Sequence, residues 1–247
     1  MLVNTFTIVL GETLEAGVLG SLLVYACHRL EVTRKVLLVG LLLGAMGAAV
    51  YGAFLNEISD WFDYTGQEWV NGLISIGVFL CLLTLARQLA TDARGRMWGL
   101  FMCGVMIFVH EGSELYLFYG SVQQSSFWQV LLSGFVGLAV GASVGVLMYY
   151  AIMLSGQYQL NAAWFLYSLV GAGLLIQASQ YLIQADALPA MEMLWNTEWL
   201  LSERSSFGQL MTATVGYEST PSPVEVLAYL VAWVAFIATR LGGFRHA

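Results

Sequence analysis

The sequence predicts an all-α polytopic membrane protein with seven transmembrane helices, arranged as an inverted repeat of three and three helices plus one. Of its 247 residues, 59% are hydrophobic and only 10% are charged, whereas a soluble domain carries about 25% charged residues. The apolar residues fall in long runs that show no alternating barrel pattern. In lipid such runs form helices, because a helix pairs its own backbone groups.

Seven apolar runs are close to the roughly 20 residues that a helix needs to cross a bilayer. We expect spans near residues 2–27, 36–55, 70–90, 97–119, 130–154, 160–185 and 224–240. The first run has no basic region before it, and acidic residues interrupt it, so we interpret it as a retained span. The seventh is short, with its apolar core between Val226 and Ala238.

The basic residues predict the orientation. With seven spans, only Arg204 lies on one side of the membrane. The other eight lie on the opposite side: Arg29, Arg34, Lys35, Arg87, Arg94, Arg96, Arg240 and Arg245. The positive-inside rule then places the N-terminus outside and the C-terminus in the cytoplasm of a multi-pass protein of the cytoplasmic (inner) membrane.

Two pairs of glutamates interrupt the first and fourth spans. Glu12 and Glu15 lie in the first span, and Glu111 and Glu114 lie in the fourth. A spacing of three residues places both carboxylates of a pair on one helix face. Each carboxylate at mid-bilayer costs about 2.5–3.5 kcal/mol, and neither span contains a Lys or Arg to offset it.

Four carboxylates on two helices favour a multivalent cation, bound protons, or both. Carboxylate oxygens are hard ligands and suit iron, manganese, magnesium or calcium. Protonated acids that hydrogen-bond between helices are the structural alternative. Ionisable groups inside a membrane most often mark a substrate path, so we take Glu12, Glu15, Glu111 and Glu114 as candidate metal ligands.

The carboxylate pairs also indicate an internal repeat. Downstream of each pair lies a glycine-rich stretch, GLLLGAMG from Gly40 and GLAVGASVG from Gly137. Each half has three spans, an odd number, so the second half is inverted, and inverted repeats carry their site at the repeat interface. We therefore expect one transmembrane domain over 1–247, with repeat one at 1–92, repeat two at 97–187, an outer loop at 188–222 and a last helix at 223–241.

Three further residues and one segment are secondary candidates. His110 precedes Glu111 and is a candidate metal ligand, proton acceptor or partner that orients a carboxylate, or else a polar packing residue. Asp60 and Asp63 lie in an outer loop and are a candidate entrance that concentrates cations, or else simply a solvated loop. The Trp-rich, amphipathic stretch 191–203 is expected to lie along the outer membrane interface.

The two motifs resemble those of the oxidase-dependent iron permease family. That family carries Arg-Glu-Gly-x-Glu in the first and fourth spans of a seven-helix protein whose N-terminus is outside. The matching segments here are Gly11–Glu15 and His110–Glu114. Gly11 and His110 replace the two arginines, and Thr13 replaces the first glycine.

The resemblance implies a permease, not an enzyme, that passes iron into the cytoplasm after a partner protein has oxidised ferrous iron outside. The four glutamates would be the ion ligands. Iron, ferric or ferrous, would be the substrate, and no bound organic cofactor is expected. The expected partners are the lipid bilayer and an extracytoplasmic ferroxidase, cupredoxin or iron-binding protein. An oligomer is left open, and no nucleic acid is expected.

Two other functions remain as alternatives. A membrane di-metal oxidoreductase also uses carboxylates in a helix bundle, but such sites usually add Glu-x-x-His on two helices, and this spacing does not occur here. A non-transporting membrane subunit could instead dock a periplasmic redox partner through its acidic outer loops.

Overall fold

The computed structural model describes residues 2–90, 97–121 and 127–243, and every regular element in these ranges is helical. In chain order the elements are α1 (Leu2–Arg29), α2 (Arg34–Ala53), α3 (Leu55–Ser59), α4 (Gly66–Ala90), α5 (Met97–Ser121), α6 (Phe127–Leu154), the 3₁₀ turn η1 (Gly156–Tyr158), α7 (Gln159–Gln184), α8 (Ser206–Val215) and α9 (Pro223–Gly243).

Within the described residues, six helices are long and apolar enough to cross a membrane: α1, α2, α4, α6, α7 and α9. In α5 the apolar stretch within the described residues is shorter, Met97–Ser113. The predicted all-helical polytopic architecture is therefore confirmed, because long apolar runs leave helix as the structure that satisfies the backbone.

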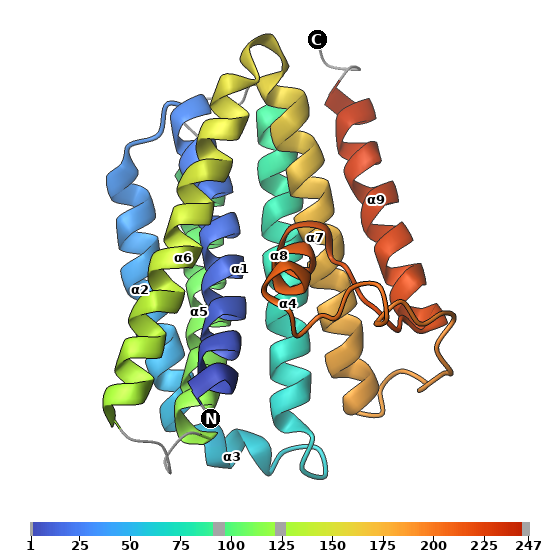
Figure 1. The fold of residues 1–247 in the computed structure, drawn as a ribbon. Coiled ribbons are helices and arrows are strands. Elements are labelled where there is room, and N and C mark those ends of the chain that lie inside the picture. Colours follow the sequence, from blue (N-terminus) through green and yellow to red (C-terminus); the bar gives the residue numbers. More distant parts are fainter. Residues whose placement is uncertain (1, 91–96, 122–126, 244–247) are drawn as a thin grey trace.

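The long helices run up and down the bundle, so the start of α1 and the end of α9 lie at opposite ends (Figure 1). Five described cations gather where α1 ends, which we call the basic end: Arg29, Arg34, Lys35, Arg87 and Arg240. The opposite, acidic end carries α3 and the turn after it, with Glu57, Asp60 and Asp63. Arg94, Arg96 and Arg245 lie outside the described residues.

Glycines let the helices pack in close pairs. The most extensive contacts join α1 to α6, α2 to α5, and α4 to α7. A Cβ on Gly17 would overlap the carbonyl oxygen of Gly141, and a Cβ on Gly44 would lie 2.6 Å from that of Val105. Small residues at such crossings allow the backbones to touch, which is a common way of joining helices in lipid.

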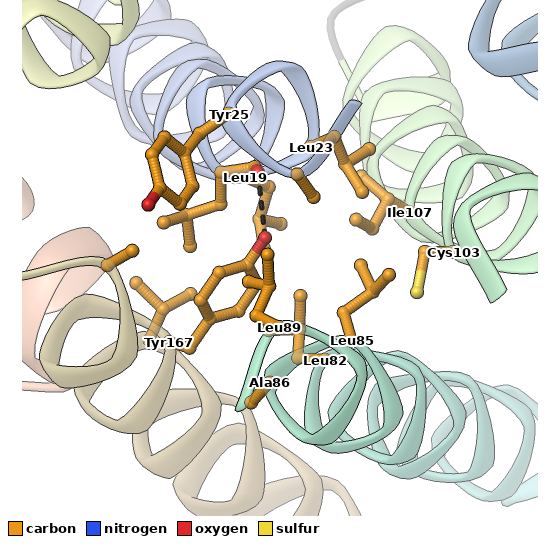
Figure 2. Close-up of a cluster of buried hydrophobic side chains, with 14 of the residues drawn as sticks. Leu19, Leu23, Tyr25, Leu82, Leu85, Ala86, Leu89, Cys103, Ile107 and Tyr167 are labelled. Carbon is orange, nitrogen blue, oxygen red and sulfur yellow. Dashed lines mark hydrogen bonds between the residues drawn. The ribbon is translucent and has the colours of Figure 1, made fainter. Parts of the chain in front are cut away.

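The hydrophobic core lies mainly in the half of the bundle nearer the basic end, and Figure 2 shows a group of its buried side chains. It joins the second halves of α1 and α4 to the first halves of α5 and α7. Tyr167 is fully buried there, and its hydroxyl donates a 2.7 Å hydrogen bond to the carbonyl oxygen of Leu22. Glu12, Glu15 and Glu111 do not belong to this core and lie nearer the acidic end.

The segment between α7 and α9 folds back onto the bundle, where α8 packs on α1 and α7. The Ser205 hydroxyl caps the start of α8 by accepting a 3.0 Å bond from the Gly208 N–H. Gly216 ends the helix in a left-handed conformation, at φ +66, and its backbone lies against Gly173, midway along α7. Residues 191–203, expected along the outer interface, form turns and irregular chain, and α8 follows them.

Candidate metal path

The direction of the first carboxylate pair is set by contacts on the opposite face of α1. The Thr13 hydroxyl lies 2.7 Å from the Val9 carbonyl oxygen and 2.8 Å from that of Gly137 in α6. Three residues span about 300° of a helix, so Glu12 and Glu15 lie about 60° apart and point away from α6. Both side chains are half-buried.

The second pair is placed on α5 in a similar way. Gly112 faces α2, because a Cβ there would lie 2.5 Å from Cβ of Ala48. Glu111 is only 5% exposed. Glu114 belongs to α5, but its side chain lies outside the described part of the structure.

His110 is fixed by a buried hydrogen-bond chain. Its Nε2 lies 3.0 Å from the hydroxyl of Ser75 on α4, and that hydroxyl donates to the carbonyl oxygen of Asn71 at 2.9 Å. Since a serine has one proton to donate, Ser75 accepts from Nε2–H. The other ring nitrogen, Nδ1, then faces the Glu111 carboxylate at 3.7 Å. His110 is 1% exposed, so it belongs to the interior of the second motif.

The two motifs lie on helices that touch each other, α1 and α5. Among the described side chains, no group of three or more His, Cys, Asp or Glu residues is placed to hold a metal ion. The side chain of Glu114, the fourth of the predicted ligands, is not among those described. Convergence of the four carboxylates therefore stays a prediction.

Glu15 lines a cavity of about 110 Å³ between α1, α7 and α8. Its polar lining also includes Gln177 and Gln180 of α7, Thr212 of α8, and Tyr217. Asp60 and Asp63, the predicted entrance, do not line it: both are exposed in the turn after α3. Sequence analysis missed this cavity because the Gln177 and Thr212 segments meet only when α8 folds back.

A second acidic group lies beside this cavity. The side-chain amide of Gln180 donates to Glu218 at 2.7 Å and to Glu225 at 2.8 Å. Glu203 accepts a hydrogen bond from the Ser219 N–H. Burial, followed by the neighbouring charge of Glu203, raises the pKa of Glu218 to about 7. In the sequence these acids are spread along a predicted loop, and only the fold brings them together.

Comparison with known proteins supports the resemblance that the motifs carry. A protein named ferrous iron permease EfeU from Escherichia coli O6:H1 is 26% identical over 268 aligned residues, covering 96% of each chain. The protein of the same name from Shigella sonnei is 26% identical and covers 94% of each chain. In Shigella flexneri the corresponding match is 25% identical and covers 76% of this chain and 91% of the relative.

No family model matches the chain, and no solved structure matches it. The similarity to the permeases nevertheless covers nearly the whole length of both proteins. It thereby confirms the resemblance of this chain to the oxidase-dependent iron permease family.

Proposed function

We propose that this chain is a membrane permease for iron ions, which bind Glu12, Glu15, Glu111 and Glu114 on their way through the bundle. The observation that carries the proposal is the buried state of Glu111, 5% exposed on a helix that contacts α1. Ionisable groups inside a membrane most often mark a substrate path, and a multivalent cation bound between the two glutamate pairs would balance their charge. The names of the relatives support iron as the ion.

Matched helix contacts support an inverted-repeat arrangement. α1 packs on α6 as α5 packs on α2, and α1 and α5 run in opposite directions (Figure 1). At the crossings, Gly141 meets Thr13, the central residue of the first motif, and Ala48 meets Gly112, its counterpart in the second. An axis in the membrane plane that exchanges residues 1–92 with 97–187 would relate these contacts.

The same contacts suggest a change in the register of the repeat. The sequence aligns Gly40 with Gly137. In the structure Gly137 meets Val9, four residues before Thr13, while Gly44 meets Phe108, four residues before Gly112. Gly44 is therefore the better counterpart of Gly137, one helical turn further along.

The separation of charges between the two ends gives the proposed orientation and direction. The described cations at the basic end would face the cytoplasm under the positive-inside rule, and the acidic end would face outward. Iron would then move from the acidic end toward the basic end. An extracytoplasmic ferroxidase, cupredoxin or iron-binding protein would deliver it at the acidic end.

Iron uptake into proteoliposomes tests this function. The purified chain is supplied with Fe²⁺ under a reductant, and separately with Fe³⁺ as a citrate complex. Each single Glu→Gln change at the four positions should lower uptake at least about tenfold, because a charged ligand is lost while the side-chain shape is kept. Glu57→Gln, an exposed acid on α3, is the matched control and should transport like the wild type. Absence of uptake by the wild type, or wild-type rates in the Glu15 and Glu111 variants, would reject the proposal.

A further inference from the structure

The cavity beside Glu15 has the size and lining of a passage for a small hydrated ion. At about 30 Å³ for each water in the liquid, its volume of about 110 Å³ accommodates a cation with some of its water. Two glutamines, one turn apart on α7, contribute side-chain amides to the lining. Carbonyl oxygens of amides bind hard cations more weakly than carboxylates do, which suits a step that must release the ion.

The cavity has a polar boundary formed by the segment that follows α7. Both amide hydrogens of Gln180 point to the carboxylates of Glu218 and Glu225. Gln180 also lines the cavity. Gln180 therefore joins the acidic group at Glu218 to the cavity that Glu15 and Gln177 line.

Packing on the other sides makes this cavity the better path to the first motif. Toward the basic end lies the packed core, where Leu22 and Tyr167 are fully buried. Toward α6, Gly17 and Gly141 touch through their backbones. The exposed Asp60 and Asp63 lie elsewhere at the acidic end.

We propose that a hydrated divalent cation reaches Glu15 through the cavity between α1, α7 and α8, and that Gln177 and Gln180 are the residues that admit it. This inference rests on the proposed function and adds to it a route and two specificity-determining residues. The glutamines exchange part of the ion's water for amide oxygen, and Glu15 then takes the ion because it adds a negative charge.

Kinetics of uptake test the role of the glutamines. Gln177→Leu and Gln180→Leu should each raise the KM for Fe²⁺ about tenfold and leave the maximal rate nearly unchanged, since the four carboxylates are intact. Gln184→Leu is the matched control: the same side chain on the same helix, but exposed and outside the cavity. It should keep the wild-type KM. Wild-type kinetics in the Gln177→Leu variant would overturn the proposal.

Thiol labelling tests the route without relying on transport. In intact cells, a membrane-impermeant thiol reagent should label the Gln177→Cys variant above the background of the wild-type chain, and Mn²⁺ should slow that labelling. The Gln184→Cys variant should be labelled at a rate that Mn²⁺ does not change. Labelling of the Gln177→Cys variant that is absent, or that Mn²⁺ does not slow, would overturn the route.

The two measurements separate this proposal from the proposed function. If the wild type takes up no iron but Mn²⁺ protects the Gln177→Cys variant, iron transport is rejected and the cation cavity stands. If the wild type transports iron and the Gln177→Leu variant behaves like Gln184→Leu, the permease stands and the route is wrong.

Discussion

At the scale of single residues, the structure accounts for the three positions where the motifs differ from the family pattern. His110 is enclosed and bonded to Ser75. A Cβ on Gly11 would lie 3.6 Å from the side-chain nitrogen of Gln209 on α8, so α8 covers the point from which a longer side chain would extend. Thr13 places its hydroxyl beside the carbonyl oxygen of Gly137 in α6. Each replacement fits a contact made by a neighbouring helix.

The bond between Ser75 and His110 gives a prediction at this scale. Ser75→Ala leaves the Nε2–H of His110 without its acceptor in a buried site, which should cost about 1–3 kcal/mol of stability. The imidazole should also turn relative to Glu111 and weaken Mn²⁺ binding, measured by titration calorimetry. Ser75→Thr keeps the hydroxyl and should restore binding.

Ser179→Ala supplies the control for this prediction. Ser179 is equally buried, but its hydroxyl bonds only within its own helix, to the carbonyl oxygen of Ile176 at 2.7 Å. If Ser75→Ala and Ser179→Ala bind Mn²⁺ alike, Ser75 does not position the histidine.

At the scale of helices, two glycines on α1 offer a matched comparison. Gly17→Ala would push a methyl group into the backbone of α6 at Gly141, whereas nothing lies within 4 Å of a Cβ on Gly20. Gly17→Ala should therefore destabilise the protein by about 1–3 kcal/mol. Gly20→Ala should be neutral, or stabilising by up to about 1 kcal/mol, since alanine favours helix. Thermal unfolding in detergent measures both, and equal Tm values would contradict the tight crossing of α1 and α6.

The segment between α7 and α9 should respond to pH through Glu218. Its pKa in the folded chain, about 7, lies above its ordinary value of 4.5, so the folded state favours the protonated acid. Below pH 4.5 the acid is protonated whether the segment is folded or open. As the pH rises to about 7, the folded segment loses stability relative to the open one. Above pH 7, the charged Glu218 faces Glu203 and Glu225, with the amide of Gln180 as its donor.

Hydrogen exchange measures this loss of stability. After correction for intrinsic rates, amides in residues 197–222 should exchange faster at pH 8 than at pH 5. Glu218→Gln should remove most of the difference, because the side chain then carries no charge at either pH. An unchanged difference in that variant would assign the pH response to another group.

At the scale of the whole molecule, the sequence predicts the long helices well. The expected spans 36–55, 97–119 and 160–185 correspond to α2, α5 and α7 with ends that differ by a few residues. Hydropathy determines these elements because lipid allows apolar runs few other structures. It does not determine α3 or α8, since a helix of ten residues with Ser, Gln and Thr is held by its contacts with α1 and α7.

The site is predictable in part for a similar reason. A carboxylate in an apolar run is costly wherever it lies in the fold, so the sequence alone indicates Glu12, Glu15, Glu111 and Glu114 as candidate ligands. The cavity is different, because its lining comes from residues as far apart as Glu15, Gln177 and Tyr217. Uncharged glutamines at a span end carry no such cost, and only the folded chain shows that they lie next to Glu15.

Anomalous scattering from crystals soaked in Fe²⁺ tests most directly whether the carboxylates of the two motifs bind iron. Data collected at the iron edge identify the element and its position in one experiment. We expect a peak between α1 and α5, within about 2.0–2.6 Å of oxygens from both motifs, and its loss in crystals of the Glu15→Gln or Glu111→Gln variant. An iron peak bound only by the outer acids Glu203, Glu218 and Glu225, with none at the motifs, would contradict it.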